Sequence, residues 1–296
     1  MTTIATRPTI AANPAMGITA QRRLMTTIIY FFLIFGAAGM LIPFIWMVGS
    51  SLKTDQEVQQ VPPTLLPHNP QWHNYLDALS PDKMDLTRSL PNTVVITVCC
   101  VIGQVISSSL VGFGFARFKF RGRDTLFVLM LSTMMLPAQV TMIPQFVLFR
   151  WLGWIDTFLP LIVPSLLAGP FFVFMFRQFF AQIPEELMEA ARIDGAGPLR
   201  IYWQIMMPLC GPVVAIVAIY TFMGTWNDFM NPLIYLNSPE NRTLALALAS
   251  FNGQHGVNQP NQLMAASFFT MIPCLILFFA AQRYFVESIA MTGSKS

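Results

Sequence analysis

The sequence predicts an all-α integral membrane protein with six transmembrane helices. Of its 296 residues, 54% are hydrophobic and only 10% are charged, and the mean hydropathy is +0.57. Several apolar runs exceed the roughly 20 residues that a helix needs to cross a bilayer. These runs are continuously apolar rather than alternating with a period of two, so they favour helices over the strands of a closed barrel.

Six helices account for the apolar runs in order along the chain. Their expected ranges are 24–50, 91–115, 124–149, 157–180, 208–230 and 263–285. Prolines lie within or near several of them, and membrane helices tolerate such breaks where neighbouring groups satisfy the freed carbonyls. In the second helix Gly103, Ser107, Ser108 and Gly112 are small, and we interpret them as positions where another helix packs closely.

The basic residues predict the orientation of the helices. Six spans place both termini on one side of the membrane, and twelve of the 17 Lys and Arg residues then fall on that side. The positive-inside rule therefore places both termini in the cytoplasm, together with the segment 183–207 between helices four and five. The outer loops are then 51–90, 150–156 and 231–262.

The remaining composition excludes several functions. A net charge of +3 is too small to indicate nucleic-acid binding, and three scattered histidines do not predict a metal site. The cysteines all fall in or beside apolar spans, so we expect small buried hydrophobes rather than disulfides. They are Cys99, Cys100, Cys210 and Cys274.

The densest charge in the chain lies in the cytoplasmic stretch IPEELMEAARIDGAGPLRIYWQIMMPL, residues 183–209. Pro184 suits a first helical position, and Glu185 and Glu186 follow where the helix dipole favours acids. Gly195 is a natural left-handed cap, and Pro198 restarts a helix. The pattern predicts two short helices joined by a glycine turn outside the bilayer.

The residues alone leave two interpretations of this stretch open. Glu189 and Arg192 are three apart and can pair on the surface of an ordinary solvated helix. The small side chains of Ala190 and Ala191 instead leave the backbone approachable, which suits insertion into the groove of a partner.

The pattern E-A-A-x-x-x-G, nine residues and I-x-x-P is formed by Glu189-Ala190-Ala191, Gly195, Ile205 and Pro208. It resembles the cytoplasmic signature loop of permease subunits in bacterial ATP-binding-cassette importers, with Met207 in place of the usual leucine. Segments 115–157, 177–196, 225–236 and 281–293 are similar to the sugar-importer branch, specifically the maltose-permease-like second subunit.

The resemblance implies a type I importer permease fold in the bacterial inner membrane. It divides the chain into a cytoplasmic tail at 1–23, a six-helix domain at 24–286 with a coupling loop at 183–207, and a cytoplasmic tail at 287–296. The implied partners are membrane lipid, a second permease subunit that completes a heterodimer, two ATPase subunits and an extracytoplasmic solute-binding protein.

The resemblance also assigns the energy supply to other chains. This chain has no G-x-x-x-x-G-K-[ST] phosphate loop, so we expect a transport subunit rather than an enzyme, without a cofactor of its own. ATP and Mg would be bound by the partner ATPase subunits. The helix at 184–195 would dock on the ATPase, with Gly195 as a turn that a side chain would crowd. The coupling residues implied are Glu189, Ala190, Ala191, Arg192, Asp194 and Gly195.

Trp226, Asn227 and Asp228 lie near the expected outer end of the fifth span. An ionisable residue there indicates a translocation path or gate, whereas the alternative is a helix end anchored at the interface by Trp226. A carbohydrate is the expected cargo, with glycerol phosphate or another anionic polyol or sugar derivative as the alternative. The distant alternatives are a stand-alone secondary transporter, which would need ion-coupling carboxylates, and an intramembrane enzyme, which the spans do not equip.

Overall fold

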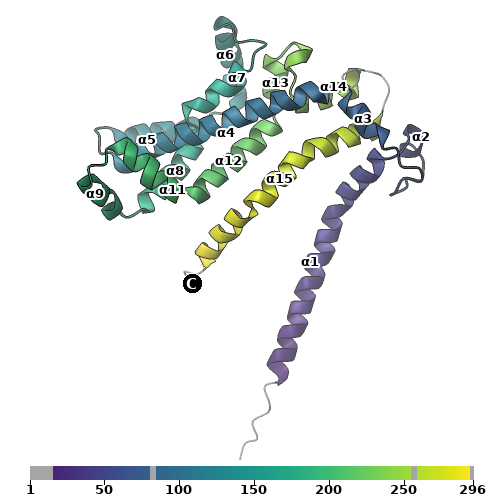
Figure 1. The fold of residues 1–296 in the computed structure, drawn as a ribbon, viewed down its shortest axis with the longest axis horizontal. Coiled ribbons are helices and arrows are strands. Elements are labelled where there is room, and N and C mark those ends of the chain that lie inside the picture. Colours follow the sequence, from purple (N-terminus) through teal and green to yellow (C-terminus); the bar gives the residue numbers. More distant parts are fainter. Residues whose placement is uncertain (1–15, 81–84, 255–258, 294–296) are drawn as a thin grey trace, which may run out of the picture.

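The computed structural model describes residues 16–80, 85–254 and 259–293, and all regular structure in these ranges is helical. Four segments are long and apolar enough to cross a membrane, and two bent helix pairs bring the number to six if each pair is one span. The four are α1 (Met16–Ser51), α4 (Leu86–Arg117), α15 (Pro260–Gly293) and the stretch from α7 (Leu159–Ile162) through η2 (Val163–Leu167) to α8 (Pro170–Gln182). Figure 1 shows α4 lying beside α8 and α12.

The third expected helix, 124–149, is a bent pair of helices rather than one continuous helix. The segment consists of α5 (Arg123–Ser132), η1 (Thr133–Met135) and α6 (Ala138–Trp151), and the two parts meet at an angle of 98°. Pro137 causes the break because it lacks an N–H and forces the residue before it out of the helical region. Leu136 accordingly is extended, with φ −82° and ψ 119°.

The fifth expected helix, 208–230, is also bent. The span begins in α10 (Pro198–Ile201), continues through the π-helical turn η3 (Tyr202–Met206) and α11 (Met207–Leu209), and turns by 81° into α12 (Gly211–Trp226). Pro208 and Pro212 flank the bend, and each removes a backbone donor from the helical ladder. The span therefore ends at Trp226, four residues before the expected end.

Short helices occupy the expected outer loops, and the terminal helices are longer than expected. These short elements are α2 (Asp55–Val58), α3 (His73–Leu79), α13 (Met230–Tyr235), η4 (Pro239–Asn241) and α14 (Leu244–Gln254). The first helix begins at Met16 and the last runs to Gly293, so part of each expected terminal tail is helical. Residues 1–15 and 294–296 lie outside the described ranges.

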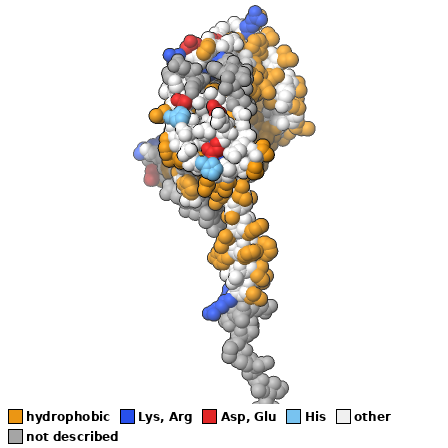
Figure 2. Space-filling model, turned by 90° about the vertical axis from the view of Figure 1, so that its right-hand side faces the viewer, with side chains coloured by type: hydrophobic (Ala, Val, Ile, Leu, Met, Phe, Trp, Pro, Cys, Tyr) orange, Lys and Arg blue, Asp and Glu red, His pale blue; other side chains and the backbone are white. Residues whose placement is uncertain are grey.

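Helix α1 contacts α15 and leaves most of its apolar surface exposed. None of its apolar stretch is buried, and its hydrophobic side chains are exposed along its length (Figure 2). Just after its C-terminal end, Lys53 is 1% exposed and donates from Nζ to the carbonyl of Thr64. Asn74 and Asn261 donate to the Lys53 carbonyl at 2.9 and 3.1 Å. These bonds join the end of α1 to α3 and α15, while the remaining apolar surface is free for lipid or protein.

Helices α4 and α8 approach each other closely at Gly112. A Cβ atom at this position would lie 2.7 Å from Phe176 Cβ and 3.1 Å from the backbone nitrogen of Arg177. The backbone of α8 therefore excludes a side chain here, as small-residue helix interfaces in membranes require. This contact agrees with the interpretation of the small residues of 103–112 as packing positions.

A polar clasp joins the segment between α6 and α7 to the segment between α13 and η4. Asp156, in a left-handed conformation with φ 62°, follows α6, and its carboxylate accepts hydrogen bonds from the backbone of Asn237 and Ser238 at 2.9 Å. The Ser238 hydroxyl also donates to it, and Asn241 donates to the Asp156 carbonyl at 2.8 Å. These hydrogen bonds hold the pKa of Asp156 well below its ordinary value. The bond from the Ser238 hydroxyl contributes most, followed by those from the backbone N–H groups.

We predict that Gly112→Ala lowers the thermal unfolding midpoint of the purified protein in detergent, because overpacking an interface costs about 1–3 kcal/mol. Gly114→Ala is the matched control, because a Cβ there meets nothing within 4 Å. Equal midpoints for the two variants would show that the α4–α8 approach is not as tight as described.

We predict that Asp156→Asn lowers the unfolding midpoint at neutral pH, because the amide cannot accept all the hydrogen bonds of the carboxylate. The folded-state pKa of Asp156 lies below the ordinary value of 3.8, so its contribution is present above that pH and is lost as the pH falls through the folded pKa. The difference between wild type and variant should be constant from neutral pH to about pH 5 and shrink below pH 3.8. A difference that shrinks near pH 6 would contradict this assignment.

Candidate functional site

The stretch that the sequence predicts to be cytoplasmic forms a helical appendage beyond the end of α8. Helix α9 (Glu185–Ile193) and α10 are the two short helices expected, and Figure 1 shows α9 at the edge of the molecule, beyond the packed spans. Pro184 is extended and immediately precedes α9, so Glu185 rather than Pro184 is the first helical residue. Glu185 and Glu186 lie in the first turn as predicted.

A glycine turn ends α9. The N–H of Gly195 donates to Arg192 O at 3.0 Å, and the N–H of Ala196 donates to Ala191 O at 2.9 Å. This is the Schellman arrangement, which requires a left-handed residue, and Gly195 has φ +77°. A Cβ on Gly195 would meet nothing within 4 Å, so crowding is not the constraint within this chain. The glycine is needed for its backbone conformation.

The inward face of α9 is part of a hydrophobic core. Met188 is 2% exposed and Ala191 8% exposed. Both pack in one buried cluster with Phe180 of α8 and Tyr202 after α10, to which α4 contributes Phe113. Ala191 thus contacts its own chain, and Ala190 is the member of the alanine pair that lies on the exposed face.

The outward face of α9 mixes acidic and apolar side chains. Glu189, Ala190 and Asp194 are exposed, as are Leu187 (46%) and Ile193 (86%). Glu189 and Arg192 form no ion pair with each other, nor with any other residue in the described part of the chain. The surface pairing that their spacing allowed is therefore not used, and Glu189 presents its carboxylate to the surroundings.

Two anchors of this segment were not predicted. Arg117, the last residue of α4, donates through Nη2 to the carbonyls of Phe180 and Ile183 at the end of α8. The hydroxyls of Ser109 on α4 and Tyr202 after α10 lie 2.6 Å apart. An arginine ending an apolar span indicates topology from sequence alone, and nothing in the sequence pairs it with a particular carbonyl.

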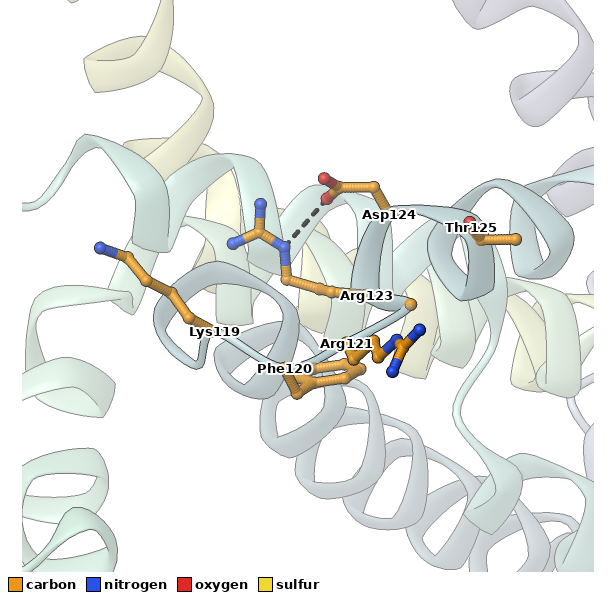
Figure 3. Close-up of a pocket in the computed structure, with 7 residues that line it drawn as sticks. Lys119, Phe120, Arg121, Arg123, Asp124 and Thr125 are labelled. Atoms are coloured by element: carbon orange, nitrogen blue, oxygen red, sulfur yellow. Dashed lines mark hydrogen bonds and ion pairs between the residues drawn. The ribbon is translucent and has the colours of Figure 1, made fainter.

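A basic turn adjoins these anchors between α4 and α5. Figure 3 shows Lys119 and Arg121 pointing away from each other and Arg123 directed towards Asp124, with 2.9 Å between Arg123 Nε and Asp124 Oδ1. Lys119 and Arg121 are exposed. The turn places positive charge at the same end of the molecule as α9, which is the distribution expected of a cytoplasmic face.

Trp226 is a packing residue at the end of α12. It is 4% exposed, its Nε1 donates to Thr270 O of α15 at 3.0 Å, and its ring stacks on Phe222 with 5.2 Å between centroids. These contacts hold α12 against α15.

Asn227 and Asp228 have separate local roles beside it. Asn227 is exposed and donates from Nδ2 to Met223 O at 2.9 Å, which caps the end of α12. The Asp228 carboxylate accepts from the backbone and side chain of Asn231 at 3.2 and 2.8 Å, which orders the start of α13. The three consecutive residues therefore face different surroundings, and Asn227 is the most accessible of them.

Comparison with known proteins places these features in a family. Residues 108–291 match the family model described as "Binding-protein-dependent transport system inner membrane component". The chain is 39% identical over 204 residues to an arabinooligosaccharide transport system permease protein of Halalkalibacterium halodurans, which covers 69% of this chain and 72% of the relative. It is 32% identical over 275 residues to an sn-glycerol-3-phosphate transport system permease protein of Pectobacterium atrosepticum, covering 91% of this chain and 97% of the relative.

A solved structure extends the similarity to the fold. A chain of a bacterial ABC transporter involved in the import of the acidic polysaccharide alginate matches with a TM-score of 0.79 at 25% identity, covering 90% of this chain and 98% of the other. The apolar spans, the capped appendage at α9 and these matches agree with one another. The chain belongs to the family of inner-membrane permease components of binding-protein-dependent transport systems.

Proposed function

We propose that the chain forms half of the translocation pathway for a carbohydrate or related solute, and that α9 couples this pathway to ATPase subunits. The observation that carries the proposal is the exposed outward face of α9 on a helix whose inward face is fixed in the core. Exposed Leu187 and Ile193 supply apolar area, and Glu189 supplies an unpaired carboxylate for basic or backbone donors of a partner.

The rigidity of α9 supports a mechanical role. Helices of nine residues are marginal in water, so the Met188 and Ala191 contacts and the Gly195 turn are what hold this one in shape. A helix fixed in this way moves as a rigid body with the spans it contacts. Closure of an ATPase dimer against α9 would therefore displace α8 and α4 rather than deform a loop.

The proposed assembly contains a second permease subunit, two ATPase subunits and a solute-binding protein outside the membrane. The exposed apolar surface of α1 supports contact with lipid or the second permease. ATP and Mg are assigned to the ATPase subunits, since this sequence has no phosphate-binding loop. We assign the end with α9 and the basic turn to the cytoplasm, which puts both termini there.

A neutral carbohydrate is the proposed cargo. Two curated relatives are named for arabinooligosaccharides and for sn-glycerol 3-phosphate, so a neutral and an anionic solute are both represented. Among the described residues, the buried polar side chains in the spans are neutral, such as Thr97, Gln104 and Ser108. Hydroxyl and amide groups suit sugar hydroxyls, whereas a phosphate would favour arginine. Asn227 is the proposed contact of the Trp226–Asp228 segment with the pathway, with Trp226 and Asp228 supporting its position.

The cargo is tested with the solute-binding protein of the same system. Its affinity for neutral oligosaccharides and for glycerol 3-phosphate, measured by calorimetry, should favour the neutral sugars. Selective binding of glycerol 3-phosphate would replace the carbohydrate by the anionic alternative and would leave the coupling role of α9 unaffected.

The outer segment 231–262 is the proposed docking area for the binding protein. The Asp156 clasp and α13 give it a fixed shape, which a docking surface requires. Residues 255–258, including His255, lie outside the described residues. Asn252, Gly253 and Gln254 are the last three residues of α14.

We predict that Glu189→Lys and Gly195→Asp each abolish transport while the chain still inserts into the membrane. The first reverses the exposed charge on α9, and the second forces a side chain into a left-handed conformation that costs about 1–2 kcal/mol. Transport is measured as solute uptake by cells, and insertion as the amount of chain in the membrane fraction.

Asp55→Lys is the matched control, because Asp55 is an exposed acid at the start of α2, far from α9 along the fold. It should retain uptake. Normal uptake by the Glu189→Lys variant would remove α9 as the coupling element.

A further inference from the structure

Helix α4 contacts the chain both before and after α9. On the α8 side, the Arg117 guanidinium holds the carbonyls of Phe180 in the last turn of α8 and of Ile183, two residues before α9 begins. On the α10 side, Ser109 holds the hydroxyl of Tyr202, which is fully buried. Charge-assisted bonds to a helix C-terminus are among the stronger polar contacts available to a side chain. A displacement of α9 therefore acts on α4 through two separate contacts.

The opposite end of α4 holds the outer segment. Asn92 donates from Nδ2 to the carbonyls of Glu240 and Arg242 at 2.7 and 3.1 Å. The backbone N–H of Leu244 donates to the hydroxyl of Thr93 at 2.8 Å. These bonds fix η4 and the start of α14, on the outer side, to the first turns of α4.

The neighbouring spans are less suited to carry a displacement between these two ends. The span containing α8 is interrupted between Val163 and Gly169, where Ala168 has φ 58°. Helix α12 is separated from α10 and α11 by the 81° bend. Helix α4 instead runs for 32 residues without a break, with Pro91 confined to its second turn.

Side chains of α4 also hold the interruption in the α8 span. The Ser107 hydroxyl lies 3.3 Å from the carbonyl of Ser165 and accepts from the N–H of Ala168 at 3.2 Å. The Cys100 thiol donates to the carbonyl of Leu161 at 3.3 Å. The broken span is thus braced along α4 rather than acting as an independent lever.

We propose that α4 is the strut that carries movement of α9 across the membrane to segment 240–244, with Arg117 and Ser109 as the positioning residues that fix α9 to it. The inference rests on the proposed coupling function of α9. It adds a defined route: α9 and the outer segment move together as one body because α4 holds both.

The experiment measures a distance along this strut in the complete transport complex, reconstituted in lipid nanodiscs. Spin labels replace Leu199 on α10 and Glu240 on η4, both exposed, in a chain that lacks Cys99 and Cys274 and keeps the buried Cys100 and Cys210. Pulsed electron paramagnetic resonance measures the distance between the two labels, first without nucleotide and then with MgATP and vanadate. We expect one narrow distribution that is the same in both states.

The double variant Arg117→Met and Ser109→Ala removes both contacts while keeping side-chain length and helix propensity. We expect its distribution to broaden and to shift with MgATP and vanadate. We also expect the solute transported per ATP hydrolysed to fall about ten-fold, within the usual range of coupling between sites. Lys119→Met is the matched control, because Lys119 is an exposed base near Arg117 in the basic turn, and it should behave as wild type.

Rescue separates positioning from folding. The Arg117→Lys variant keeps a cationic donor at this position. If the double variant assembles poorly, the Arg117→Lys variant should still give the narrow distance distribution. A wild-type distance that itself changes with MgATP and vanadate would overturn the proposal, as would an unchanged distance in the double variant. Absence of ATP hydrolysis by an intact wild-type complex would instead count against the coupling function itself.

Discussion

The burial of Met188 and Ala191 is the interaction on which the arrangement depends. Full burial of a methionine side chain is worth about 1.5–3 kcal/mol, which is comparable to the cost of ordering the backbone of one or two residues. This contact joins a nine-residue polar helix to the core formed by α4, α8 and the residues after α10. With its inward face fixed, α9 keeps one face free for a partner, and force applied to that face reaches the spans.

In the proposed function, energy coupling and cargo recognition lie in separate parts of the chain. The features of α9 concern only attachment and movement, and they are independent of which solute passes. Cargo contacts would lie in the spans and outer segments, where the described side chains offer hydroxyls, amides and aromatic rings. The two curated relatives, named for a neutral and an anionic solute, are consistent with one coupling design serving different pathways.

Continuous apolar runs predicted the existence of the spans, and the caps predicted α9 and its glycine turn. The sequence could not give the bends at Pro137 and Cys210, because a proline predicts a break but not its angle. It also could not tell Ala190 from Ala191. The inward face of α9 is set by contacts with Phe180 and Tyr202, which belong to other elements. The sequence also could not predict that Trp226 packs on α15, because a uniformly apolar helix carries no periodic signal for its buried side; its expected place at an interface or gate stays a prediction.

Cross-linking at Ile193 tests whether α9 contacts the ATPase, because this side chain is 86% exposed on the outward face of α9. Ile193→Cys, as the only cysteine in the chain, would be treated with a short bifunctional maleimide in membranes that contain the whole transport system. We expect an adduct between this chain and the ATPase subunit, and no such adduct from a cysteine at the exposed Val61, which we assign to the outer side. Two outcomes in an assembled complex would contradict contact between α9 and the ATPase. One is an ATPase adduct from Val61, and the other is no adduct from Ile193 while other positions of this chain cross-link to the ATPase.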